Sequence, residues 1–308
     1  MANAFSNLPG RAQFAAAGAG LAVQNRFASE GSKGKFLALM LLALTIAITA
    51  IVAILAWAFV EGRTRLDLGL IFNGPSTVYR ATAGYSVAIF GTLQIIGGVI
   101  ALIIPLGVGA ALYLEQFADK TKWWNRVIEV NIQNLAGVPS IVFGILGLAF
   151  FVRGPFSWGL VAAAGSATVA LLVLPTVILA SREAIKAVPP SILEGSLALG
   201  ATRWQAVWRQ VLPAAAPGML TGVILAVSRA IGEAAPLLLV GALTFVTFAP
   251  NFFDGGYSAL PVLIYNYAGR PQEEFQILAA AGVLLMLAVL IVINSFAIWL
   301  RARYERSW

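Results

Sequence analysis

Long runs of apolar residues alternate with short polar stretches along most of the sequence. Each long run exceeds the roughly 20 residues that cross the hydrocarbon core of a bilayer as a helix. The pattern therefore predicts an all-α integral membrane protein. We expect six transmembrane helices, at residues 36–60, 86–114, 130–152, 154–181, 214–245 and 275–300. They form one membrane domain, 36–303, between a mobile N-terminal segment, 1–35, and a short tail, 304–308.

One polar interruption, residues 191–213, predicts two short helices joined at Gly200. Two residue pairs have the spacing of a capping box, in which a hydroxyl and a carboxylate or amide side chain satisfy the free amides of a helix start. These pairs are Ser191 with Glu194 and Thr202 with Gln205. Helices of this length are not stable alone. We therefore expect the pair of helices to be a docking element.

The second of these helices has an apolar, aromatic face. Trp204, Val207, Trp208 and Val211 follow one another at intervals of three or four residues, so they lie on one side of a helix. A short polar helix with an aromatic face favours contact with a partner protein over a catalytic role.

The distribution of Lys and Arg predicts the orientation in the membrane. Fourteen of the 20 basic residues flank the spans on the side of the 191–213 segment and both termini, and five lie on the other side. By the positive-inside rule, the first side is cytoplasmic. The net charge of +7 is thus a topology signal. The basic residues are spread over four separate loops, which argues against a nucleic-acid surface.

The sequence contains no Cys and no His, which excludes disulfides, cysteine or histidine zinc sites and histidine catalysis. The Gly31–Lys35 stretch lacks the spacing of a phosphate-binding P-loop. We therefore expect no cofactor in this chain and no ATP hydrolysis by it. Any ATP is bound by partner subunits.

Two charged residues, Arg229 and Glu233, interrupt the fifth apolar run. A charge near the bilayer centre costs about 3 kcal/mol on insertion scales, whereas a helical ion pair of this spacing contributes only about 0.2–0.5 kcal/mol. Pro236 follows and removes a helix hydrogen bond beside the pair. Counting from Pro213 places Arg229 about 24 Å along the helix, past its middle toward the outer side. A pathway role is favoured over a structural ion pair.

The chemistry of the pair suggests two uses. The guanidinium of Arg229 offers a fork of donors suited to an oxyanion, and Glu233 can accept a hydrogen bond from a protonated phosphate. Alternatively, the two side chains latch a gate. The residues leave both uses open.

Ser140 follows Pro139, which disfavours helix before it and is allowed at a helix start. The third span is therefore expected to begin near Pro139. Ser140 and the free amides of that helix start are candidate anion contacts, and a simple helix start or kink is the competing interpretation.

Small residues recur every fourth position in the fifth span: Ala214, Gly218, Gly222, Ala226, Ala230 and Ala234. Such a stripe lets another helix approach closely. The pattern does not distinguish a helix of this chain from one of a sister subunit.

Four stretches resemble the permease subunits of phosphate-specific ABC importers, the A-type subunit in particular. They are 136–151 (AGVPSIVFGILGLAFF), 191–213, 228–242 (SRAIGEAAPLLLVGA) and 258–275 (SALPVLIYNYAGRPQEEF). The resemblance extends from about Gly84 to Arg303.

The resemblance implies a type I-like importer permease in the bacterial inner membrane, with both termini cytoplasmic. It implies four partners besides the lipid bilayer: a C-type sister permease, an ATPase dimer, a periplasmic phosphate-binding protein and inorganic phosphate. Arg229 and Glu233 match the charged residues of the family's pathway, and Arg182 resembles a second functional arginine. The resemblance also implies that the segment containing Glu194, Gly200, Trp204 and Trp208 couples to the ATPase.

Three alternatives remain open. The transported anion is phosphate or another oxyanion, such as sulfate, molybdate or phosphonate. A passive anion channel needs no coupling segment. An intramembrane enzyme needs a nucleophile or metal set at depth, for which this sequence offers only the Arg229–Glu233 pair and scattered Ser and Thr residues.

Overall fold

The computed structural model describes residues 10–119, 121–242, 246–248 and 251–304, with side chains described from Gly34 to Arg303 within these ranges. Residues 1–9 of the predicted N-terminal segment and 305–308 of the predicted tail lie outside them, whereas backbone from Gly10 onward is helical. The described residues form an all-α fold, as the apolar pattern predicts.

The helices are α1 (Gly10–Gly62), α2 (Leu68–Phe72), α3 (Ser86–Ile103), α4 (Gly109–Leu112), α5 (Trp123–Ala136), α6 (Ser140–Gly147), α7 (Ala162–Lys186), α8 (Pro190–Ala198), α9 (Arg203–Ala206), α10 (Leu212–Gly232), α11 (Ala235–Leu239), α12 (Leu260–Ala268) and α13 (Glu273–Tyr304). Single π-helical turns extend α3, α4, α6 and α9, at Ile104–Val108, Tyr113–Phe117, Leu148–Val152 and Val207–Val211. A π turn inserts one extra residue and shifts the helix faces beyond it.

Five helices within the described residues are long and apolar enough to cross a membrane. They are Gly34–Arg65, Ser86–Phe117, Ala162–Lys186, Arg203–Gly232 and Glu273–Arg303. A sixth span exists if the bent pair Trp123–Ala136 and Ser140–Val152 is counted as one. The predicted number of spans is thus confirmed at five to six.

Three predicted spans have different bounds in the structure. The third, 130–152, is bent by 108° between α5 and α6, because Pro139 supplies no amide to a continuous helix. The fourth, 154–181, begins only at Ala162, after a turn in which Ser157 and Gly159 have positive φ. The fifth, 214–245, ends at Gly232, since Glu233 is extended and Pro236 cannot continue the helix.

The chain divides into two compact units, Met1–Trp57 and Ala58–Trp308. In the first unit, every described side chain from Gly34 to Trp57 is exposed, although nearly all are apolar. This composition suits a helix surrounded by lipid.

Helix α7 is the centre of the second unit, and it is the most buried of the candidate spans. It packs against α3 and α10. A Cβ on Gly218 of α10 would lie 2.7 Å from the Cβ of Ala184, and Gly222 approaches Ala180 still more closely. The two glycines of the stripe therefore pack against α7 of this same chain, which is one of the two partners that the sequence leaves open.

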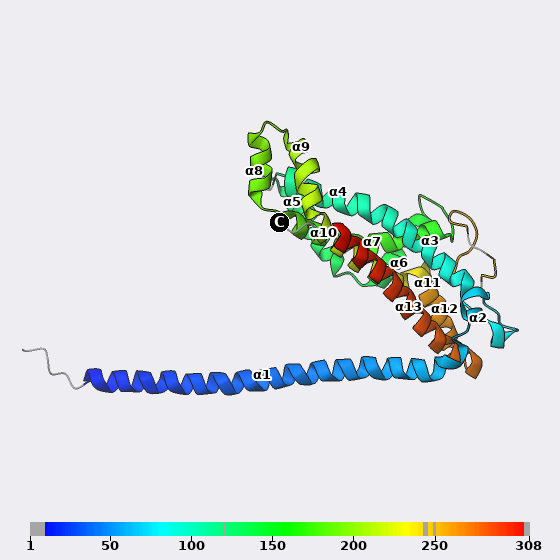
Figure 1. The fold of residues 1–308 in the computed structure, drawn as a ribbon, viewed down its shortest axis with the longest axis horizontal. Helices are drawn as coiled ribbons and strands as arrows, with labels where there is room; N and C mark the ends of the chain where they lie inside the picture. Colours follow the sequence, from blue (N-terminus) through cyan, green and yellow to red (C-terminus); the bar gives the residue numbers. More distant parts are fainter. Residues whose placement is uncertain (1–9, 120, 243–245, 249–250, 305–308) are drawn as a thin grey trace, which may run out of the picture. The chain divides into compact units, whose positions relative to one another are not determined.

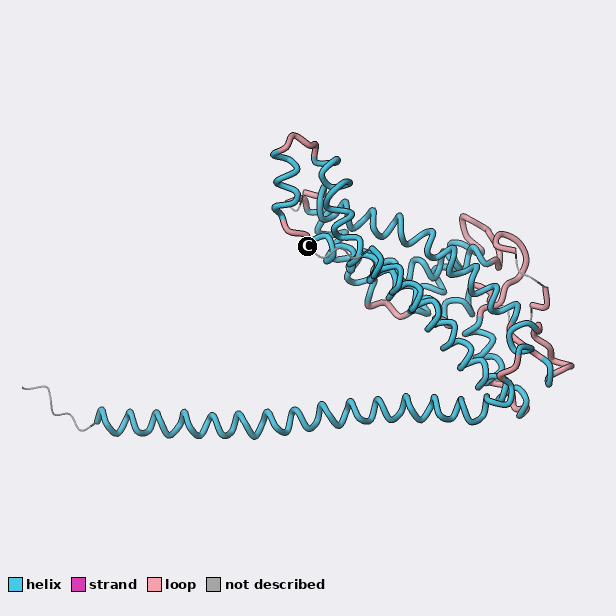
Figure 2. Tube along the Cα trace, in the orientation of Figure 1, coloured by secondary structure: helices cyan, strands magenta, loops and turns pink. Residues whose placement is uncertain are grey.

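Within this unit, α8 and α9 lie at one end, toward which α13 also ends (Figure 1). Loops gather at the opposite end, around α2 and α12 (Figure 2). We call these the α8–α9 end and the α2–α12 end.

Candidate functional site

Helix α10 stops in the middle of a long apolar run. Glu233 follows its last residue, Gly232, with an extended backbone (φ −80°, ψ 112°), and α11 starts at Ala235. Pro236 stands in the first turn of α11, where its missing amide costs nothing. Non-helical backbone in a membrane is tolerated where it is buried in protein or lines a water-filled cavity. We call residues 233–234 the α10 break.

Arg229 and Glu233 meet at this break, as their spacing predicts. Nε of Arg229 donates to Oε1 of Glu233 over 3.3 Å. The arginine side chain is 46% exposed and the glutamate side chain 17% exposed. Because a charge does not face lipid at low cost, we expect water or protein beside this side of α10.

The packing of α10 on α7 gives the depth of the pair. Gly218 is opposite Ala184 and Gly222 is opposite Ala180, so the two helices are antiparallel. Continuing this register places Arg229 level with Val173, near the middle of the 25-residue helix α7. The pair is therefore nearer to mid-depth than the count from Pro213 predicts.

A polar contact that the sequence analysis did not identify lies next to Arg229. The hydroxyl of Ser228 is 2.6 Å from Oδ1 of Asn294 on α13. Both side chains are half-buried. A single Asn in the apolar run 275–300 is the signal that marks this contact, since polar residues in spans usually have partners on neighbouring helices.

The broken third span packs against the segment beyond the α10 break. A Cβ on Gly144 of α6 would lie 2.8 Å from Cα of Pro236. Ser140 is half-buried in the first turn of α6, and Pro139 is the N-cap residue, so the predicted helix start is confirmed. The structure thus places the helix that carries Ser140 beside α11.

Arg182 lies elsewhere, at the α8–α9 end. On the α7–α10 register it is level with position 220, about 13 Å along the axis from Arg229. Nε of Arg182 donates to Glu115 over 3.2 Å, and its Nη2 donates to Glu129 over 2.6 Å. Neither glutamate was identified from the sequence, because each is more than 50 residues away along the chain.

The structure confirms one of the two helix caps predicted for the 191–213 segment. The hydroxyl of Thr202 accepts a hydrogen bond from the backbone amide of Gln205 over 3.3 Å. The side-chain oxygen of Gln205 accepts one from the backbone amide of Thr202 over 3.0 Å. The Ser191–Glu194 cap is wrong. Pro190 is already the first residue of α8, so Ser191 lies inside the helix. Gly200 turns the chain with φ +84°.

The predicted aromatic face is divided in the structure. Val207 and Val211 are buried against the helical body, whereas Trp204 and Trp208 are exposed and stack with their ring centres 5.5 Å apart. The π-helical turn at Val207–Val211 contributes to this division, because it shifts the helix faces within the segment. Glu194 is also exposed. The exposed tryptophan pair is therefore available to a partner.

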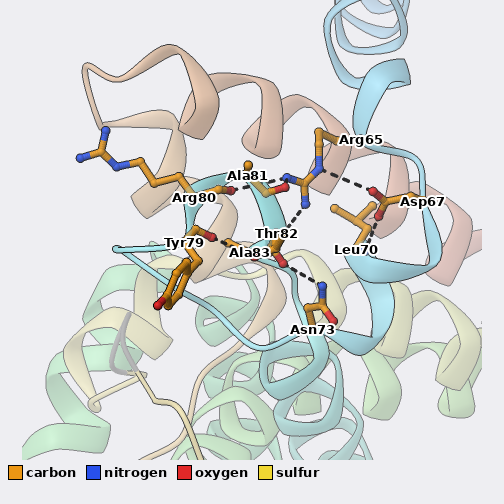
Figure 3. A network of polar contacts seen from close by, with 9 residues as sticks. All are labelled: Arg65, Asp67, Leu70, Asn73, Tyr79, Arg80, Ala81, Thr82 and Ala83. Atoms are coloured by element: carbon orange, nitrogen blue, oxygen red, sulfur yellow. Dashed lines mark hydrogen bonds and ion pairs between the residues drawn. The ribbon is translucent and has the colours of Figure 1, made fainter.

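The α2–α12 end is held together by a polar network (Figure 3). The Arg65 guanidinium donates to the carbonyls of Ala81 and Ala83, the latter over 2.7 Å. The side-chain amide of Asn73 donates to the backbone carbonyl of Thr82 over 2.8 Å. These bonds tie the loop between α2 and α3 to the turn Arg63–Arg65 that follows α1.

Aromatic rings fill the space beneath this loop. Tyr85 meets Tyr267 edge-on at 5.5 Å, and Tyr267 stacks on Phe275 at 5.2 Å. Burial raises the pKa of Tyr267 to about 12 and holds the pKa of Tyr85 well above its usual value. Both phenols therefore stay neutral at physiological pH. Among the described side chains, no cluster of three or more metal-binding residues occurs.

Comparison with known proteins identifies the family. Residues 103–307 match the family described as the binding-protein-dependent transport system inner membrane component. The phosphate transport system permease protein PstA 1 of Mycobacterium tuberculosis is 33% identical over 70% of this chain and 69% of its own. PstA of Yersinia pestis is 32% identical over 77% of this chain and 79% of its own.

A solved structure has the same fold. A bacterial ABC transporter involved in the import of the acidic polysaccharide alginate contains a chain that superimposes with a TM-score of 0.59 and 15% identity, covering 91% of this chain and all of that one. With its several apolar helices, the present chain is a multi-pass inner membrane protein. It belongs to the binding-protein-dependent transport system inner membrane components and has the fold of an ABC importer permease.

Proposed function

We propose that this chain is a permease subunit of an ATP-driven importer for inorganic phosphate. The observation that carries the proposal is the Arg229–Glu233 pair at the α10 break, near mid-depth of the helical body. The names of relatives at 32–33% identity, which are phosphate transport system permeases, support phosphate as the substrate.

The α10 break suits a point in a transport pathway. Interrupted helices are where membrane transporters commonly form their substrate sites, because the freed backbone groups and nearby charges face the cavity. The Arg229 guanidinium supplies a fork of donors for phosphate oxygens. Glu233 accepts a hydrogen bond from a protonated phosphate and repels a fully ionised anion, or it holds Arg229 until the pathway opens.

The exposure of Arg229 supports a second subunit. A guanidinium that is 46% exposed in the isolated chain needs water or protein around it within the bilayer. We propose that a sister permease packs on this side and that the aqueous pathway runs between the two chains, with Ser140 on α6 near it.

The α8–α9 end supports docking of an ATPase. Trp204 and Trp208 form an exposed stacked pair on a helix that is anchored to the body by its buried residues Val207 and Val211. We propose that this end and both termini are cytoplasmic, in agreement with the excess of basic residues. Glu194 and Gly200 shape the docking surface. A periplasmic phosphate-binding protein would then meet the α2–α12 end.

The test is uptake of radiolabelled phosphate by proteoliposomes that contain the assembled importer and its binding protein. We expect ATP-dependent uptake that Arg229→Leu abolishes and Arg229→Lys restores poorly, because ammonium lacks the fork. Arg153→Leu, which removes an exposed loop arginine, is the matched control and should transport normally.

Three results would contradict the proposal. Uptake without ATP would indicate a passive channel, and uptake of sulfate in preference to phosphate would indicate another oxyanion. Normal phosphate uptake by a stably inserted Arg229→Leu protein would return the pair to a structural role.

A further inference from the structure

A buried charge cluster joins three helical segments at the α8–α9 end. Arg182 of α7 bonds to Glu115, in the π-helical turn Tyr113–Phe117, and to Glu129 of α5. The Arg182 and Glu115 side chains are 7% and 6% exposed, whereas Glu129 is 41% exposed. Helices α5 and α7 are therefore linked through one guanidinium.

The occupied guanidinium argues against a direct contact with a transported anion. Nε and Nη2 of Arg182 are each used by a carboxylate. An oxyanion approaching Arg182 would compete with these bonds and face the repulsion of two negative groups. A pocket of about 260 Å³ adjoins the cluster, and its charged lining residues are Arg126, Glu129 and Arg182. Arg182 is thus held in place rather than offered to an anion.

The position of the cluster along the chain suggests what it transmits. Arg182 lies one turn before the end of α7, and α8 begins at Pro190. Glu129 lies two turns before the end of α5, after which the chain bends by 108° into α6. A displacement of α8 and α9 that moves the end of α7 therefore pulls on α5 through the Arg182–Glu129 bond.

We propose that Arg182, Glu115 and Glu129 form a positioning triad. It carries movement of the α8–α9 segment to the bend at 137–139 and does not bind the transported anion. This inference rests on the proposed function, because it assumes that the α8–α9 segment moves when a partner hydrolyses ATP. Glu115 holds the orientation of the guanidinium, and Glu129 is the link to α5.

Glu129→Gln is the sharpest variant. It weakens the bond to α5 but leaves Arg182 paired with buried Glu115, so the cluster keeps a neutralised arginine. Glu183→Gln is the matched control. It makes the same change one residue from Arg182, on an exposed glutamate that pairs with Lys186 over 2.8 Å.

The measurements use the assembled importer in proteoliposomes. For Glu129→Gln we expect the maximal phosphate uptake rate to fall about tenfold at an unchanged KM, while ATP hydrolysis persists. A tenfold effect lies within the usual range of coupling between two sites of a protein. The chain has no cysteine, so Val138→Cys gives it a single thiol, which lies at the bend. Its labelling by a thiol reagent should change on ATP addition with native Glu129 and not with Glu129→Gln.

The outcomes separate the two proposals. Absence of phosphate uptake by the native importer contradicts the proposed function. If the native importer takes up phosphate and Glu129→Gln raises the KM at a normal maximal rate, the triad is overturned and the cluster lies in the anion path. Uptake and labelling equal to those of Glu183→Gln also overturn it. If Glu129→Gln does not assemble, Arg182→Lys is used, with the same expected loss of rate at constant KM.

Discussion

Gly144 of α6 lies against Pro236 of α11 so closely that a Cβ on Gly144 would be 2.8 Å from the proline Cα. Helix α6, which follows the bend at 137–139, and helix α11, which follows the α10 break, are thus in contact close to the backbone. Only a residue without a side chain permits this separation.

Gly144→Ala should therefore force α6 and α11 apart. Overpacking of this kind costs about 1–3 kcal/mol. We expect a lower thermal unfolding temperature in detergent and a loss of transport. Gly109→Ala, a helical glycine with open space around it, is the control and should leave both unchanged. Equal behaviour of the two variants would show that the contact is not tight.

Reversal of the charged pair distinguishes a latch from an anion contact. In the double variant Arg229→Glu with Glu233→Arg, mutual attraction is kept but the guanidinium moves from helix α10 into the extended break. We expect no recovery of phosphate uptake relative to the single variants, in the logic of a double-mutant cycle. Recovery of uptake would show that attraction alone suffices, as in a latch.

Gly200→Ala should weaken attachment of an ATPase. The φ of +84° is costly for any residue with a Cβ, by about 1 kcal/mol, so the turn between α8 and α9 is disturbed. We expect less ATPase to co-purify with the membrane subunits. Gly195→Ala, in α8 with open space around the added Cβ, is the control. Unchanged co-purification with Gly200→Ala would separate this turn from docking.

Thr92→Val should destabilise the α2–α12 end. The buried hydroxyl of Thr92 accepts from the Leu260 amide over 2.8 Å and so satisfies the start of α12. A buried amide left without its acceptor costs about 1–3 kcal/mol. We expect a lower unfolding temperature for Thr92→Val and near-native stability for Thr92→Ser. A native unfolding temperature for Thr92→Val together with a loss in Thr92→Ser would show that the methyl group, rather than the hydroxyl, matters.

Features set by local pattern were accessible from the sequence. Apolar runs predicted the number of spans, and the four-residue spacing placed Arg229 beside Glu233. The capping box at Thr202 depends only on its own turn and was correct. The one at Ser191 failed because two preceding prolines start the helix earlier.

Features that depend on distant segments were not accessible. Glu115 and Glu129 gain meaning only when α7 brings Arg182 to them, and Ser228 meets Asn294 across two spans. The 108° bend after α5 follows from tertiary packing as well as from Pro139, since a proline alone does not set an angle. The π-helical turn that shifts faces after Trp204 has no clear sequence signature.

The glycine–alanine seam between α7 and α10 has a dynamic consequence. Its members, Gly218 with Ala184 and Gly222 with Ala180, leave no side-chain atoms that could rotate to permit sliding. We therefore expect α7 and α10 to move as one unit, with α8 and α9 as the connection between them. We expect the non-helical residues 137–139 and 233–234, which lead into α6 and α11, to act as hinges in that movement.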